Sequence, residues 1–231
     1  MTTKEVLTYL QSQSNSKNVE GMKHFGISSP KAFGVPTPVL RKLAKQIGKN
    51  HQLALELWAA SIYEARIIAS FIAEPEKATE KLLEEWAQEF DNWAVCDSCC
   101  SNFFDKTSFA YTKAIEWTKR KEEYVKRAGF VLMAVLAVHD KTTSNERFIK
   151  FFPFIKKHST DERNFVRKAV NWALRQIGKR NTILQKNAIA LAEEIVQIDS
   201  PSARWIARDA LRELKNKKTH VRKLPVKLTK L

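Results

Sequence analysis

The sequence contains little glycine and little proline, with 6 and 7 of them among 231 residues. Helix-forming residues occur throughout, and no stretch alternates apolar and polar residues for long enough to predict a strand. Together these features exclude a sheet-rich fold and predict an all-α protein. The length suffices for one sizeable core or for two small ones.

Long apolar runs are also absent. The most apolar uncharged run, 128–139 (AGFVLMAVLAVH), is far too short to span a bilayer and predicts a buried helix. The N-terminal sequence MTTKEVLTYLQSQ reads as an amphipathic helix without the apolar centre of a secretion signal. We therefore expect a cytoplasmic protein.

The sequence offers little material for metal, cofactor or triad chemistry. Its three cysteines, Cys96, Cys99 and Cys100, form one C-x-x-C-C cluster without a second pair or a nearby histidine. They are better read as small buried residues than as metal ligands. The five histidines are scattered, and no glycine-rich phosphate loop is present. We expect neither a metal nor a cofactor.

Negative charge is scarce relative to positive charge. Lys and Arg number 40 and Asp and Glu 25, which gives a net charge of +15 and a pI near 9.8. Solubility requires no such excess, so the composition indicates an anionic partner, and nucleic acid is the commonest one.

Helical spacing, interrupted by turn-forming residues, divides the chain into segments. A helix at the N-terminus is followed by a polar joint at 12–18 and a Gly/Pro-rich loop. Further helices are expected at about 38–47, 52–61, 63–72, 76–90, 92–104, 108–118, 122–138, 145–157, 163–177, 182–196 and 202–215. The basic tail 217–231 has no clear periodicity, and we expect it to be loosely ordered or to run over the surface.

The helix at 163–177 combines an apolar face with a cationic one. Arg167, Lys168 and Arg175 share the polar side with Trp172, which suits nucleic acid. Asn164 is a candidate N-cap and Gly178 a candidate terminator. In the alternative interpretation, Trp172 fills the core and the charges are merely solvated.

A weak internal repeat places related segments at the start of alternate helices. Arg66, Asp97, Arg127, Lys168 and Arg204 occupy corresponding positions, separated by roughly 30–45 residues. This irregular period predicts a right-handed α-solenoid of HEAT-like helix pairs, as one domain over 1–216. The second helices would then line a concave groove, where a stripe of cations could bind a DNA backbone.

Asp97 is the acidic member of this otherwise cationic series. Trp93 lies four residues earlier, so both side chains share a helix face. A carboxylate in a cationic groove repels phosphate, but it would stabilise a positive charge that develops on a sugar or would orient a water molecule. The alternative is that Asp97 is an ordinary salt-bridge residue.

The segments NWAVCD, YVKRAG, FVRKAVNWALR and GVPTPVLRKLA resemble the HEAT-like-repeat alkylpurine DNA glycosylases of the AlkD type, from about Gly21 to Leu214. The resemblance implies excision of positively charged N3- and N7-alkylated purines from duplex DNA, without reliance on a tight base-flipping pocket. It assigns catalysis to Asp97, with lesion contacts from Trp93, Trp172, Arg127 and Arg175.

The chain departs from this family near its N-terminus. Where the family has an aromatic residue facing DNA, this sequence has Gly21 or Met22, with Phe25 nearby. We expect backbone contacts from five cations: Lys126, Arg167, Lys168, Arg204 and Arg208. The protein would act as a nucleoid-associated monomer. A non-catalytic module for bent, branched or damaged DNA and a solenoid that binds an acidic protein remain alternatives.

Overall fold

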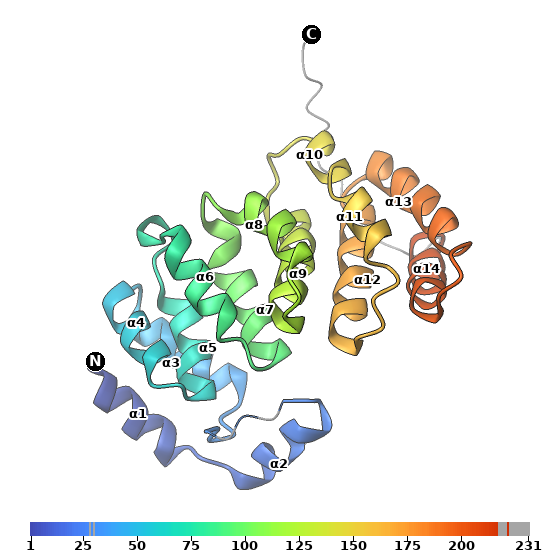
Figure 1. The fold of residues 1–231 in the computed structure, drawn as a ribbon. Coiled ribbons are helices and arrows are strands. Elements are labelled where there is room, and N and C mark those ends of the chain that lie inside the picture. Colours follow the sequence, from blue (N-terminus) through green and yellow to red (C-terminus); the bar gives the residue numbers. More distant parts are fainter. Residues whose placement is uncertain (28, 30, 217–220, 222–231) are drawn as a thin grey trace. The chain divides into compact units, whose positions relative to one another are not determined.

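The computed structural model describes residues 1–27, 29, 31–216 and 221, and every regular element in these residues is a helix (Figure 1). The predicted all-α class is therefore confirmed. Backbone contacts divide the chain into two compact units, Met1–Phe109 and Ala110–Leu231. The single domain over 1–216 stays a prediction, and the predicted tail at 217–231 lies outside the described residues except for Val221.

The first unit is built around helix α5 (Tyr63–Ile72), of which almost every residue is buried. Helices α3, α4 and α7 all pack against α5. The elements of this unit are α1 (Thr3–Ser12), α2 (Ser16–His24), α3 (Thr37–Ile47), α4 (His51–Ala59), α5, a 3-10 helix at Pro75–Lys77, α6 (Glu80–Gln88), α7 (Trp93–Asn102) and a 3-10 helix at Phe104–Lys106.

The second unit is built around α9 (Glu123–His139) and α12 (Asn164–Gly178), which pack against each other along their lengths. The remaining elements are α8 (Ala110–Glu116), a 3-10 helix at Trp117–Lys119, α10 (Asn145–Ile149), α11 (Phe152–Lys157), α13 (Thr182–Ile195) and α14 (Pro201–Leu214). The apolar run at 128–139 forms the buried part of α9, as predicted. Within the described residues, no helix combines the length and hydrophobicity that crossing a membrane requires.

The helices alternate as the repeat predicted. Arg66, Asp97, Arg127, Lys168 and Arg204 lie on α5, α7, α9, α12 and α14, respectively. In the first unit α5 packs on α7, and in the second unit α9 packs on α12 and α12 on α14. Each set of second helices is therefore contiguous within its unit, which is the packing of an α-solenoid.

One member of the predicted basic stripe belongs to the core instead. Arg66 is 8% exposed, and its guanidinium lies 4.8 Å from the ring of Trp58, which stacks on Trp86 at 4.0 Å. It also binds the carboxylate and the backbone carbonyl of Glu89. Arg66 is therefore a structural arginine, because its charge is already neutralised and its side chain is covered.

Helix α2 was not predicted, since its sequence is polar and it has no fully buried residue. It forms because Asn15 caps its first turn, accepting a hydrogen bond from the Asn18 amide at 3.2 Å. The Asn18 side-chain amide then donates to the carbonyl of Gly34 at 2.8 Å. Side-chain and backbone bonds to the following loop thus position α2, in place of an apolar face.

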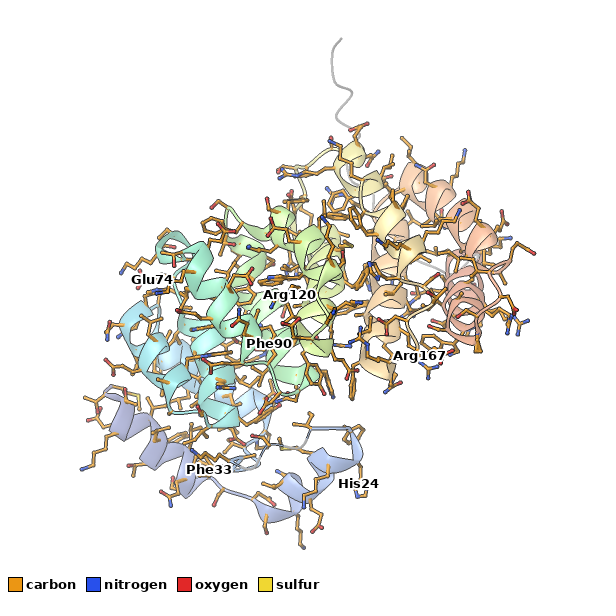
Figure 2. The ribbon with its side chains drawn as sticks, viewed as in Figure 1. His24, Phe33, Glu74, Phe90, Arg120 and Arg167 are labelled. Atoms are coloured by element: carbon orange, nitrogen blue, oxygen red, sulfur yellow. The ribbon has the colours of Figure 1, made fainter. Side chains whose placement is uncertain are left out.

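That loop is held by a buried carboxylate. Glu64 on α5 is 0% exposed and accepts hydrogen bonds from the amides of Phe33, Gly34 and Val35, at 2.6–3.2 Å. Figure 2 shows Phe33 in this segment between α2 and α3. A single acidic side chain of the central helix therefore fixes the connection between α2 and the rest of the unit.

Three predicted boundaries are wrong for local reasons. The helix expected at 76–90 begins at Glu80, because the Thr79 hydroxyl caps the Leu82 amide at 3.1 Å. The helix expected at 145–157 is broken into α10 and α11, because Pro153 in the first turn of α11 has no amide hydrogen to continue α10. At α12, Asn164 is the first helical residue, and Arg163 precedes it without a side-chain cap.

Gly178 ends α12 for a reason other than the predicted one. It is the last helical residue, and a Cβ there would lie 2.8 Å from a Leu214 methyl and 3.0 Å from the Ala188 Cβ. Glycine is thus required by the close approach of α12 to α13 and α14, and not by a left-handed turn.

We expect Gly34→Ala to destabilise the protein by about 1–3 kcal/mol. Gly34 has φ +75°, and an added Cβ would lie 2.3 Å from the carbonyl oxygen of Asn15. Gly21, in α2, has nothing within 4 Å of an added Cβ. Gly21→Ala should therefore raise the free energy of unfolding by about 0.5–1 kcal/mol. Urea denaturation measures both, and equal effects would contradict this account of Gly34.

The partly buried imidazole of His158 makes the free energy of unfolding depend on pH. Burial lowers the pKa of His158 from 6.5 to about 4, and the nearby positive charges of Lys126, Lys157 and Arg163 act in the same direction. The negative charge of Asp161 opposes this shift. Its Nε2 has no hydrogen-bond partner among the residues that the structure describes, and its ring forms an edge contact with Phe130. The folded state therefore holds the neutral ring.

As the pH falls below 6.5, the unfolded chain protonates His158 before the folded chain does, so stability is lost between about pH 6.5 and pH 4. We expect this group to account for about 1–2 kcal/mol after screening by solvent. In His158→Phe the denaturation midpoint should vary less over this range. A variant at the exposed His24, His24→Gln, should keep the wild-type pH dependence; loss of the dependence there would contradict the assignment.

Candidate functional site

Helix α7 presents two candidate residues on one face and its thiols on the other. The buried side chain of Asn92 caps the helix, accepting from the amides of Ala94 and Val95 at 3.0 Å. Val95 and the three cysteines face the core, whereas Trp93 and Asp97 are partly exposed one turn apart. Small buried side chains thus orient Trp93 and Asp97 away from the core, as their spacing predicted.

The cysteine cluster serves packing. Cys96, Cys99 and Cys100 are each 0% exposed, and burial raises the pKa of Cys99 and of Cys100 well above the ordinary thiol value. The thiols of Cys99 and Cys100 are therefore protonated and unreactive at neutral pH. Across the described residues, no three His, Cys, Asp or Glu side chains are grouped closely enough to hold a metal ion.

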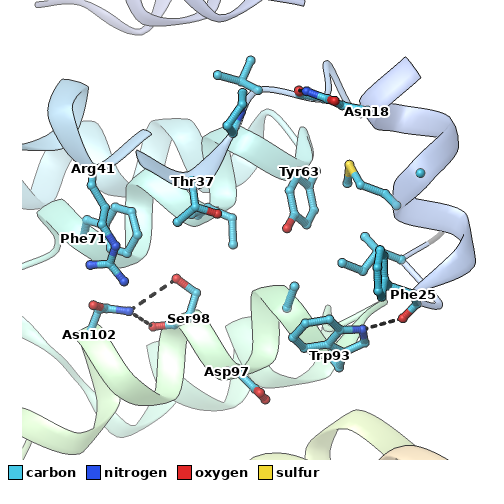
Figure 3. A pocket seen from close by; sticks show the side chains of 18 of the residues that line it. Asn18, Phe25, Thr37, Arg41, Tyr63, Phe71, Trp93, Asp97, Ser98 and Asn102 are labelled. Carbon is cyan, nitrogen blue, oxygen red and sulfur yellow. Dashed lines mark hydrogen bonds between the residues drawn. The ribbon is translucent and has the colours of Figure 1, made fainter. Parts of the chain in front are cut away.

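Trp93 and Asp97 line a pocket of about 690 Å³ within the first unit (Figure 3). Its walls come from α2, the loop before α3, α3 itself, α5 and α7. Figure 3 shows the phenol of Tyr63 pointing towards the helix that carries Trp93 and Asp97. Most of the lining is apolar or aromatic, so the pocket can accept flat apolar surface. Asp97 lies at the edge of the pocket, and its carboxylate points to the side of the helix away from Tyr63 (Figure 3).

The indole of Trp93 ties α7 to the segment after α2. Its Nε1 donates to the backbone carbonyl of Phe25 at 2.8 Å (Figure 3). Phe25 is 71% exposed and lines the pocket together with Gly21 and Met22. Gly21 and Met22, where the resemblance implies an aromatic residue, therefore lie in the wall of this pocket, and Phe25 supplies an exposed aromatic ring there.

Polar groups form the opposite side of the pocket. Ser98 and Asn102 line it, and the side-chain amide of Asn102 donates to the Ser98 carbonyl at 2.8 Å. Behind them, the hydroxyl of the buried Ser70 lies 2.7 Å from the Ser98 hydroxyl. Burial, and then the charge of Glu64, raises the pKa of Tyr63 to about 12, so its phenol stays protonated and can donate a hydrogen bond.

Sequence reasoning missed four cations beside this pocket. A second cavity of about 380 Å³ shares Arg41, Phe71 and Asn102 with it. We call the surface formed by Arg41, Lys45, Lys49 and Lys106 the cationic groove. Arg41 and Lys45 are four residues apart on α3, and Lys49 follows by four more. This i,i+4 spacing could have indicated a cationic surface, but lysines on helix surfaces are too common for the spacing alone to predict a binding site.

The candidates on the second unit lie on α9 and α12. Arg127 is 6% exposed and donates to the Phe165 carbonyl at 2.6 Å, so it links these helices. Trp172 is partly exposed, which leaves part of its ring accessible. Arg175 pairs with Glu213 at 2.8 Å and with Asp209 at 3.5 Å. Their roles at a lesion stay predictions.

The five predicted backbone-binding cations differ in whether they already interact with other side chains of the second unit. Lys168 and Arg208 are exposed, and Arg204 pairs with Asp199 at 2.8 Å. Lys126 is paired with Asp161 at 3.4 Å. The guanidinium of Arg167 lies 5.1 Å from the ring of Trp205, which is 39% exposed. Trp205 and Arg208 also line a cavity of about 320 Å³ on α14.

The chain is similar to known proteins over nearly its whole length. Residues 6–218 match the family described as DNA alkylation repair enzyme. A solved structure from a new family of proteins related to the HEAT-like repeat DNA glycosylases, with affinity for branched DNA structures, superposes with a TM-score of 0.76 at 22% identity, covering 92% of this chain and 95% of that one. This likeness establishes the HEAT-like α-solenoid fold.

The structure of an engineered protein aligns with this chain at 16% identity, over 76% of this chain and 90% of the engineered chain. Its TM-score of 0.39 is too low to bear on fold or function. No curated protein matches the sequence significantly. The extent of the family match decides the classification: the chain belongs to the family of DNA alkylation repair enzymes.

Proposed function

We propose that the protein is a DNA glycosylase that releases N3- and N7-alkylated purines from duplex DNA. The observation that carries this proposal is the placement of Asp97 one turn from Trp93, at the edge of an aromatic pocket in a strongly basic chain. A carboxylate in this setting weakens phosphate binding. It is useful to the protein if positive charge develops beside it.

The reaction is a hydrolysis. Breaking the C1′–N bond leaves both bonding electrons on the base, which neutralises the positive charge of the alkylated purine and creates an oxocarbenium-like sugar. The Asp97 carboxylate stabilises this sugar and orients the water whose oxygen bonds to C1′, while the proton of that water passes to solvent. The electron-rich face of Trp93 stabilises the same cation.

The remaining candidates have supporting roles in this proposal. Trp172, Arg127 and Arg175 take the lesion-contacting roles that the resemblance to the alkylpurine glycosylases implies. Lys126, Arg167, Lys168, Arg204 and Arg208 bind backbone phosphates. Each of these contributes position and affinity, and the charge stabilisation comes from Asp97.

Single-turnover release of 7-methylguanine from a defined duplex tests the proposal. We expect release that saturates with enzyme concentration, and none from the same duplex without the lesion. No release, together with tight and salt-sensitive DNA binding, would refute the glycosylase. Binding without salt dependence would also refute nucleic acid as the ligand and favour an acidic protein partner.

A second candidate function is non-catalytic binding of branched DNA. One observation favours it: the structurally similar protein has affinity for branched DNA structures. The resemblance to the alkylpurine glycosylases also implies an aromatic residue where this chain has Gly21 or Met22. This function would be established by a four-way junction that binds at least about tenfold more tightly than a duplex of equal length, without base release. A tenfold ratio of dissociation constants corresponds to a difference of about 1.4 kcal/mol in binding free energy.

A further inference from the structure

The cationic groove of the first unit has no assigned role. Arg41, Lys45, Lys49 and Lys106 line its cavity, and none of the remaining lining residues, Ala44, Gly48, Phe71 and Asn102, is acidic. All four cationic residues are exposed. Four positive charges around one cavity without a carboxylate in its lining constitute a site that attracts an anion.

Three of the four cationic groups are held in position by neighbouring protein groups. The guanidinium of Arg41 lies 4.6 Å from the Phe71 ring centroid. The Lys49 ammonium donates to the carbonyls of Phe71 and Ala73 at 2.9 and 2.8 Å. The Lys106 ammonium donates to the Asn102 carbonyl at 2.8 Å. An ammonium has three hydrogens, so both lysines keep at least one donor for a ligand.

The charges of the groove are not neutralised within the part of the chain that the structure describes. None of its four cations forms an ion pair, whereas Lys77 and Lys81 of the same unit pair with Glu74 and Glu85. Burial, and then the charge of Lys106, lowers the pKa of Lys49, against the opposing effects of Glu76 and Glu74. The lysines therefore repel each other, and a bound anion would relieve this repulsion.

The groove is continuous with the pocket at Asp97. Arg41, Phe71 and Asn102 belong to the lining of both cavities. Figure 3 shows Arg41 against Phe71, and Asn102 close to Ser98 one turn earlier on α7. An anionic chain that places one of its sugars at Asp97 can thus continue into the groove without leaving the unit.

We propose that the cationic groove binds the phosphodiester backbone of the strand whose sugar lies at Asp97, contacting at least one phosphate adjacent to the lesion. This inference deepens the proposed function and depends on DNA being the ligand. Arg41 sits where the two cavities meet and contacts the phosphate nearest to the pocket. Lys45, Lys49 and Lys106 hold the strand that continues from it, so all four are positioning residues.

The test compares two triple variants that remove the same formal charge. Lys45→Gln/Lys49→Gln/Lys106→Gln removes three of the four charges of the groove and keeps Arg41. Lys4→Gln/Lys77→Gln/Lys81→Gln removes three exposed lysine charges elsewhere in the first unit. Binding to a lesion-free duplex is measured from about 50 to 200 mM salt, the range over which phosphate contacts are resolved. Log K falls as log salt rises, and we expect this fall to become shallower by at least about 0.9 in the groove variant, the contribution of one phosphate contact. In the control variant the slope should stay unchanged.

Equal slopes in the two triple variants would overturn the proposal, since net charge alone would then explain binding. An unchanged DNA slope with weakened binding to phosphatidylglycerol vesicles would also overturn it. If the groove variant fails to fold by circular dichroism, the single reversal Lys45→Glu decides instead, because Lys45 makes no hydrogen bond within the described residues and its loss should leave the fold intact.

Failure of this inference can be told apart from failure of the proposed function. Lesion-free DNA undergoes no excision, so the slopes are independent of catalysis. A changed slope without release of 7-methylguanine would keep the groove and refute the glycosylase. Release by the wild type with unchanged slopes would refute the groove alone.

Discussion

Asp97→Asn is expected to lower the single-turnover rate of 7-methylguanine release by at least about 10²–10³-fold, the usual effect of removing one preorganised stabilising group. The amide has nearly the shape of the carboxylate but no charge, so it cannot stabilise the sugar cation. Because a negative charge no longer repels phosphate, the affinity for lesion-containing duplex should be equal to that of the wild type or higher. Rate and affinity are measured on the same duplex.

Asp91→Asn is the matched control for this variant. Asp91 is exposed, precedes the cap of the same helix and does not line the pocket. Its Oδ1 accepts a hydrogen bond from the side-chain amide of Asn92 at 2.7 Å, and an asparagine keeps an oxygen that can accept this bond. The same chemical change at this position should therefore leave the excision rate within about twofold. Wild-type activity in Asp97→Asn would remove Asp97 from the catalytic role and leave it as a structural carboxylate.

Glu64→Gln should destabilise the protein by about 2–4 kcal/mol, the range for breaking charge-assisted hydrogen bonds at a buried carboxylate. The carboxylate accepts from the amides of Phe33, Gly34 and Val35 while it is itself 0% exposed. A glutamine offers one acceptor oxygen and directs its amide hydrogens at amides that are donors themselves. Thermal and urea denaturation measure the loss.

Glu56→Gln supplies the control. Glu56 also accepts two hydrogen bonds, from Thr3 and Gln52, but it is exposed on α4. Water replaces such partners, so this variant should leave the denaturation midpoint close to that of the wild type. Similar losses in both variants would show that burial of Glu64 has no special weight.

The Glu64 interaction also connects stability with the candidate site. The loop that Glu64 holds binds α2 through Asn18, and α2 supplies Met22 to the pocket wall. We therefore expect Glu64→Gln to weaken binding at the pocket in addition to lowering stability. A buried side chain that contacts no ligand can in this way set the shape of a site.

Much of this architecture is encoded locally. The apolar faces of α9 and α12 and the low content of glycine and proline predicted helices, and the spacing of Arg66, Asp97 and Arg127 predicted helix pairs. The i,i+4 relation of Trp93 and Asp97 was sufficient to place them on one face of α7. Helical period is a property of neighbouring residues, so the sequence alone determines it.

What the sequence could not determine depends on contacts between distant segments. From the sequence, Gly178 is equally compatible with a helix stop and with a site of close packing. The positions of Leu214 and Ala188 show that close packing is the reason for glycine there. Arg66 reads as a member of a basic stripe until Glu89 and Trp58 are found to enclose it.

The polar sequence of α2 becomes a pocket wall only because the loop that follows it is bound by Glu64, which lies 30 residues after Gly34 of that loop. The sequence by itself therefore determined the all-α fold, the helix pairs and the pairing of Trp93 with Asp97. Tertiary structure alone decided which cations are free to meet an anion and where the pocket lies, because burial and charge neutralisation depend on partners that local spacing does not specify.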